Sequence, residues 1–132
     1  VGLPVVIDNA NYQFVFPESV EGTLYSFDGG YVQENELLHG SGYWLRFENS
    51  GNVTIIGNEL NQLIIELNQG WNLLSGISSE IALVNVDDPE NLIIPGTVYS
   101  FENGYVQADS FQPGYGYWLR SSGTGSITLN QN

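Results

Sequence analysis

The chain contains no cysteine and no methionine, and its only basic residues are two arginines, Arg46 and Arg120. Without cysteine it has no disulfide, no thiol nucleophile and no thiolate ligand for a metal. Without lysine it has no amine for Schiff-base chemistry. These absences remove several classes of covalent catalysis and of structural metal site.

Positive charge is scarce as well, because 15 acidic residues stand against two arginines and give a formal net charge of −13. A chain this acidic repels phosphate backbones, so we expect no nucleic acid partner. No apolar run approaches the roughly 18 residues that span a bilayer, so we expect no membrane insertion. No basic segment precedes an apolar one near Val1, and we expect no signal peptide within these residues.

The chain carries one segment twice. Residues 22–46 and 96–120 match at an offset of 74 positions, and 15 of the 25 positions are identical. Shared residues are mostly aromatic, glycine and hydroxyl types. An internal repeat of this length predicts a duplicated structural module.

The similarity extends beyond this segment, since residues 51–55 match 125–129 and residues 1–3 align with 75–77. The strand expected at 70–74 has no counterpart in the first copy. We therefore assign a first repeat to 1–58, lacking its initial strand, and a second to 59–132, packed together as one unit. The unpaired edge predicts cover by residues 127–130, or strand exchange with a neighbouring module or a second chain.

Periodicity and turn residues predict an all-β fold of two homologous antiparallel β-modules, forming a sandwich or small barrels with pseudo-symmetry. Glycine and asparagine in the turn at 28–30 and its repeat supply positive φ. One short helical turn is expected within 78–91, with its counterpart at 17–21. Strands are expected at 23–27, 31–33, 43–47, 53–56, 62–67 and 70–74, and at the repeats of the first four.

The strand Gly-Tyr-Trp-Leu-Arg, present in both copies, is the first candidate site. Alternation places Tyr43 and Leu45 on one face, with Trp44 and Arg46 on the other. Its repeat presents Trp118 and Arg120 in the same way. An exposed indole beside a guanidinium suits a sugar ring, whereas a small module also needs its tryptophans in the core with arginine paired to a carboxylate.

Other aromatic residues offer a further surface. Tyr115, together with Tyr31 and Tyr105, lines a groove or forms cross-strand pairs. Trp71 follows a turn glycine, and the pattern predicts that Trp71 and Leu73 face the core.

Catalytic and metal-binding patterns are weak. The acidic segment 85–91 is rich in oxygen ligands but lacks the spacing of a calcium loop and is not repeated, so a solvated loop is favoured over a calcium site. His39 is replaced by Pro113 in the second copy. We expect no enzyme activity, no cofactor and no catalytic residue; paired carboxylates of a glycoside-active enzyme are a distant alternative.

The Gly-Trp-Asn-Leu-Leu opening and the repeated Gly-Tyr-Trp-Leu-Arg body resemble tandem β-repeat modules of large secreted or surface multidomain bacterial proteins. The resemblance implies an extracellular location and a non-catalytic structural or adhesion role, and it assigns no ligand residue. The alternative is a carbohydrate-binding accessory module with polysaccharide as its partner.

Overall fold

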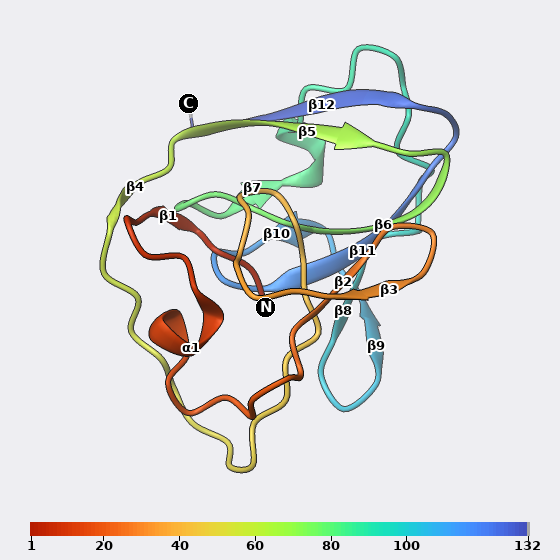
Figure 1. Ribbon diagram of the computed structural model, residues 1–132. Helices are drawn as coiled ribbons and strands as arrows, with labels where there is room; N and C mark the ends of the chain where they lie inside the picture. Colours follow the sequence, from red (N-terminus) through yellow and green to blue (C-terminus); the bar gives the residue numbers. More distant parts are fainter. Residues whose placement is uncertain (132) are drawn as a thin grey trace.

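The computed structural model describes residues 1–131 and is all-β, with 40% of its residues in strands and 5% in helix. Every sheet pairing is antiparallel (Figure 1). In chain order the elements are β1 Val5–Val6, α1 Tyr12–Val15, β2 Tyr25–Phe27, β3 Tyr31–Gln33, β4 Asn58–Glu59, β5 Gln62–Leu67, β6 Gly70–Ser75, β7 Ile81–Ala82, the 3₁₀ turn Leu83–Asn85, β8 Tyr99–Phe101, β9 Tyr105–Gln107, β10 Ser110–Phe111, β11 Gly116–Ser121 and β12 Gly125–Asn130.

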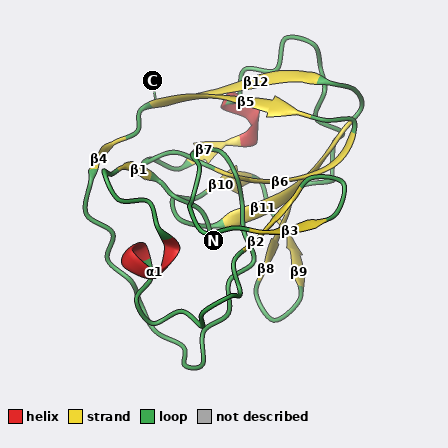
Figure 2. Ribbon diagram, viewed as in Figure 1, coloured by secondary structure: helices red, strands yellow, loops and turns green. Residues whose placement is uncertain are grey.

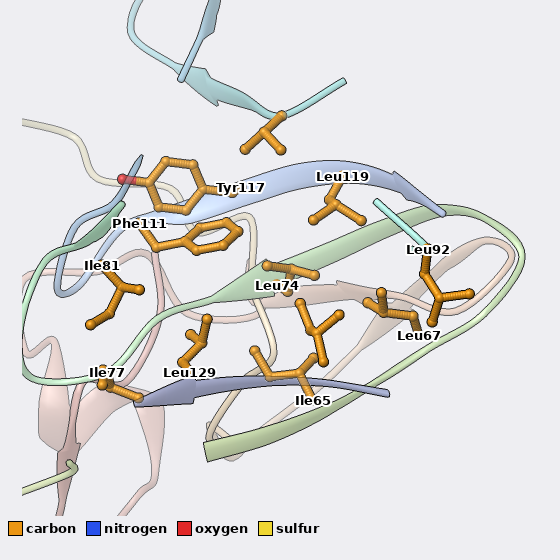
Figure 3. Close-up of a cluster of buried hydrophobic side chains, with 12 residues drawn as sticks. Ile65, Leu67, Leu74, Ile77, Ile81, Leu92, Phe111, Tyr117, Leu119 and Leu129 are labelled. Atoms are coloured by element: carbon orange, nitrogen blue, oxygen red, sulfur yellow. The ribbon is translucent and has the colours of Figure 1, made fainter. Parts of the chain in front are cut away.

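The second copy holds its core between two facing layers. One layer is the β5–β12 pair, and the other is the sheet ordered β6–β11–β8–β9. Ile65 and Leu129 point inward from the first layer, and Leu74 and Leu119 from the second (Figure 3). Among residues 1–131 no closed barrel forms. The alternating burial of β11 and β12 is the period-two pattern that a half-buried strand requires.

The first copy has a smaller amount of regular structure. Its pairs are β2 with β3 and β1 with β4, and much of the chain between 34 and 57 is loop (Figure 2). Its core cluster nevertheless contains buried aromatic and aliphatic side chains. They are Leu3, Tyr12, Val15, Phe16, Leu24, Leu37 and Tyr43. The core cluster of the first copy, with the residues packed against it, comes from residues 1–55. That of the second copy comes from residues 60–129.

Two strand predictions in the first copy are wrong, namely 43–47 and 53–56. In the second copy the equivalent segments are β11 and β12, which pair with β6 and β5. The first copy has no strands equivalent to β5 and β6, so its segments have no ladder to join. Residues 43–47 make only isolated bridges, and 53–56 form no strand at all. A partner strand, more than local propensity, decides whether such a segment becomes a strand.

The predicted cover of the open edge by residues 127–130 is also wrong. These residues belong to β12, and they pair with β5 in register from Ile127 opposite Ile65 to Asn130 opposite Gln62. The C-terminal strand therefore pairs within the second copy and is not available to cover the first. Among residues 1–131, only Val1 pairs with the edge of the first copy at residues 43–47.

Many local hydrogen bonds recur at the 74-residue offset. The Tyr43 hydroxyl accepts a hydrogen bond from the Leu38 amide at 2.8 Å, and the Tyr117 hydroxyl accepts one from the Gln112 amide at 2.8 Å. Burial raises the pKa of both tyrosine hydroxyls. The predicted turn conformations are also present, with φ of 69° at Gly29 and 57° at the equivalent Asn103.

The short helical turn of the second copy lies within the expected segment, as the 3₁₀ turn Leu83–Asn85. Its predicted counterpart at 17–21 is wrong, because the first copy has α1 at Tyr12–Val15 instead. The Asn11 side chain caps α1 by accepting a hydrogen bond from the Gln13 amide at 2.9 Å. The side-chain cap that Asn11 provides therefore places the helix at 12–15, ahead of the predicted segment 17–21.

The two copies meet through an exchange of backbone contacts. The Ser75 amide donates to the Gly40 carbonyl at 3.0 Å, and the Gly2 amide donates to the Gly114 carbonyl at 3.0 Å. Gly40 and Gly114 are equivalent residues, so Gly2 occupies the place of Ser75. Spatially, Val1 then corresponds to Leu74, one position away from the gap-free sequence alignment. A side chain at Gly2 would put its Cβ 2.1 Å from the Ser75 Cβ, so only glycine fits this contact.

Candidate aromatic binding site

The two copies exchange aromatic side chains across their interface. Phe27, at the end of β2, contacts Trp118 of the other copy, with ring centroids 4.9 Å apart and planes at 76°. Phe101, at the end of β8, contacts Trp44 of the first copy at 5.0 Å and 73°. Each pair maps onto the other by the 74-residue offset. Each copy thus contributes a phenylalanine to the tryptophan of its neighbour, in the edge-to-face geometry that aromatic pairs prefer.

One of these pairs belongs to a cavity of about 370 Å³, which we call site A. Five aromatic side chains line it, and they come from both copies. They are Phe27, Trp71, Tyr99, Tyr105 and Trp118. The volume is within the range of small-molecule and cofactor sites.

The prediction that Trp71 faces the core is wrong. Trp71 is 44% exposed and stands at 90° to Trp118, with ring centroids 6.4 Å apart. The buried residues of β6 are instead Asn72, Leu74 and Ser75. The Asn72 side chain accepts from the Asn68 amide at 2.9 Å and donates to the Asn68 carbonyl at 2.9 Å, which holds the β5–β6 turn. A buried asparagine with these partners sets the phase of the strand and leaves Trp71 outside.

The equivalent position in the first copy, site B, is incomplete. Tyr25, Tyr31 and Trp44 line a shallow depression there, and Phe101 stands against Trp44. No residue takes the place of Trp71, because the strand that would carry it is absent from the described residues. Sites A and B are therefore not equivalent, contrary to the expectation of two equal sites.

The alternation predicted for the repeated Gly-Tyr-Trp-Leu-Arg segment is present. Tyr43, Tyr117 and Leu119 are at most 4% exposed, whereas Trp44 and Trp118 are half-buried. Both tryptophans are thus partly in the core and partly in a surface site. Within residues 1–131 their indole Nε1 atoms are buried and have no hydrogen-bond acceptor.

Arg46 and Arg120 are exposed, and neither lines site A. Within residues 1–131 neither guanidinium has a carboxylate partner within 4.0 Å, so the predicted ion pairs are not formed. Tyr115 is 48% exposed and lines a second cavity together with Val1 and Trp44, and it is not among the residues that line site A. Of the predicted site residues, only Trp118 reaches site A.

Phe27 and Tyr99 line site A and were not selected from the sequence, whereas Tyr105 was named there as a groove residue and Trp71 was assigned to the core. The repeat indicated that aromatic side chains gather there, because Tyr25 and Phe27 share one face of β2, and Tyr99 and Phe101 share the equivalent face of β8. What the pattern did not reveal was that each phenylalanine reaches the opposite copy.

The acidic segment 85–91 is an ordered turn. Asp88 accepts hydrogen bonds from the Leu92 amide at 2.8 Å and the Ile93 amide at 2.9 Å. Among residues 1–131 no group of three or more histidine, cysteine, aspartate or glutamate side chains is arranged to hold a metal ion. In the same part of the chain, no helix has the length and apolar character needed to cross a membrane. His39 contacts the Val5 carbonyl through Nε2 at 2.8 Å.

Comparison with family models, with curated proteins and with solved structures found no significant match to this chain.

Proposed function

We propose that the protein is a non-catalytic, extracellular β-module of a larger bacterial protein, and that it binds a neutral polysaccharide at site A. The observation that carries the proposal is the exposure of Trp71, 44%, inside a cavity walled by four further aromatic rings. A purely structural module would bury its indoles. Flat aromatic faces open to solvent suit the apolar CH face of a sugar ring.

Charge restricts the ligand further. The net charge of −13 repels acidic glycans, and the only cationic side chains, Arg46 and Arg120, lie outside site A. A neutral glycan is not repelled in this way. The hydroxyl groups of Tyr99 and Tyr105 are the polar groups that the lining offers to sugar hydroxyls.

The test is affinity electrophoresis against a panel of soluble neutral polysaccharides, with calcium and with EDTA, followed by titration of tryptophan fluorescence. We expect retardation on one class of neutral glycan, unaffected by EDTA. Trp71→Ala should weaken binding about tenfold or more, which corresponds to about 1.4 kcal/mol. Ile64→Ala changes a residue that is 62% exposed and outside site A, and it should leave binding unchanged.

The repeat offers a matched pair of variants. Trp118→Ala removes a wall of site A, whereas Trp44→Ala removes the equivalent ring at site B. We expect the first to weaken binding and the second to have little effect. Equal loss in both variants, or no retardation on any neutral glycan, would reject the proposal. Competition by phosphocholine would instead assign site A to a quaternary ammonium ligand, which aromatic walls also favour.

The second candidate is a structural or adhesion module that assembles with neighbouring repeats. It is favoured by the uncovered strand edge of the first copy. The glycan titration discriminates the two, because a structural module would show no retardation while retaining its fold.

A further inference from the structure

The uncovered edge of the first copy lies along residues 43–47. In the second copy, the equivalent strand β11 pairs with all of β6, from Gly116 opposite Ser75 to Ser121 opposite Gly70. In the first copy, Val1 and Tyr43 exchange two backbone hydrogen bonds, at 2.7 and 2.9 Å, which reproduces the pairing of Tyr117 with Leu74. The ladder then ends, because nothing among residues 1–131 continues it beyond Val1.

Past the pairing with Val1, the backbone of residues 44–47 has hydrogen-bonding groups that a further strand could pair with. Trp44 and Arg46 use their backbone groups toward Tyr25, Thr23 and Val20, on the inner side. Leu45 alternates with them and faces the opposite side, where its amide and carbonyl form no hydrogen bond within residues 1–131. Unpaired strand groups of this kind are a template for another strand.

The side chains at this edge also lack cover. Leu119 is 0% exposed on the inner face of the sheet in which β11 pairs with β6, whereas its equivalent Leu45, which has no such partner strand, is only half-buried. A cavity of about 330 Å³ opens here, lined by residues of both copies that include Val1, Leu45, Phe47, Leu73 and Tyr115.

The segment of the first copy that is equivalent to β12 also lacks its partner strand. Ile127 and Leu129 of β12 are 0% exposed beneath their partner β5. Val53, the residue equivalent to Ile127, is 39% exposed, and Ile55, the residue equivalent to Leu129, is only half-buried. Both segments that the β5–β6 hairpin covers in the second copy are therefore open in the first.

From these contacts we infer that the first copy is an acceptor site for a β-hairpin of the β5–β6 kind, supplied by a further repeat of the same type. The occupant is defined by what covers the equivalent surface in this molecule. Its second strand would run antiparallel to 43–47 and end next to Val1. Its first strand would lie against residues 51–56, in the register of β5 on β12. This inference does not depend on the proposed glycan binding.

The occupant would also complete site B. In the second copy, Trp71 lies opposite Arg120 and its ring stands against Trp118. The tryptophan of a docked hairpin would lie opposite Arg46 and stand against Trp44.

The experiment joins a copy of residues 61–73 directly to Val1, so that the donor residue equivalent to Leu73 precedes the place of Leu74. We expect the Leu45 and Phe47 amides to exchange hydrogen about tenfold more slowly or better than in the original protein, and Ile56 to become protected. The denaturation midpoint should rise. The same peptide added separately, with a fluorescent label, should bind with a saturable anisotropy change.

The matched control inserts one glycine between the donor and Val1. A slip of one residue turns every donor side chain to the wrong face, so the gain in protection should be lost. Leu45→Asp, at a half-buried position that the 132-residue protein leaves open, should abolish binding of the separate peptide. The inference is wrong if the in-register donor gives no protection at Leu45, or if the slipped donor protects it equally well.

Discussion

Because the chain carries a repeat, the same substitution can be made at two equivalent positions that differ in burial. Leu119, on β11 beside β6, is 0% exposed between the two layers of the second copy, and Leu45 occupies the same place in the first copy without a neighbouring strand equivalent to β6. Replacing a fully buried leucine by alanine costs about 3 kcal/mol, from lost transfer free energy and the cavity that remains. At Leu45, where solvent already reaches the side chain, we expect about 1 kcal/mol.

The assay is urea unfolding followed by tryptophan fluorescence, with the free energy of unfolding obtained for both variants and the original protein. Both should shift the midpoint at an unchanged slope, since neither alters the surface exposed on unfolding by much. Leu38→Ala, at 64% exposure, serves as the surface control and should cost less than about 0.5 kcal/mol. Equal costs for Leu45→Ala and Leu119→Ala would show that β6 does not decide the burial of this position.

Three further predictions address single groups. Tyr117→Phe removes the acceptor of the Gln112 amide and should lower the free energy of unfolding by about 1 kcal/mol in the same urea assay. Asp88→Ala leaves the Leu92 and Ile93 amides without their acceptor and should cost about 2 kcal/mol, measured by thermal unfolding, whereas Asp87→Ala should cost less. The pKa of the Val1 α-amino group falls from its ordinary 8.0 to about 6 on folding, so the unfolded chain binds more protons between these values; the stability of the 132-residue protein should be greatest above pH 8, decline as the pH falls toward 6, and stay flatter in this window after N-terminal acetylation.

The all-β fold could be predicted because its signals are local. Alternating side chains mark β5, β11 and β12, and glycine or asparagine marks the turns that need positive φ. The same reasoning failed for residues 43–47 and 53–56, whose sequences are as strand-like as those of their equivalents. Their state depends on hairpin partners that lie elsewhere in the fold, and no local pattern contains that information.

The candidate site shows a similar division. The faces of Trp44 and Trp118 follow from alternation, whereas that of Trp71 was assigned to the core because a tryptophan outweighs an asparagine in any hydrophobicity pattern. Asn72 is buried because its amide group holds the turn after β5, an interaction specific to its geometry. The crossing of Phe27 to Trp118 is a contact between copies, and only the packed structure reveals it.

The composition of site A connects the two proposals. Its walls come from three sources: Phe27 from the β2 hairpin of one copy, Trp118 with Tyr99 and Tyr105 from the other, and Trp71 from the hairpin that precedes that copy's body. The second repeat, 59–132, therefore supplies Trp71, Tyr99, Tyr105 and Trp118, and the first repeat completes the site with Phe27. If a further hairpin docks on residues 43–47, the incomplete site B gains its missing tryptophan and becomes comparable with site A. A protein carrying the in-register donor should then bind two equivalents of the same ligand, whereas the 132-residue protein binds one. A stoichiometry of one in both proteins, with protected Leu45 in the first, would separate docking from ligand binding and confine the ligand to the geometry of site A.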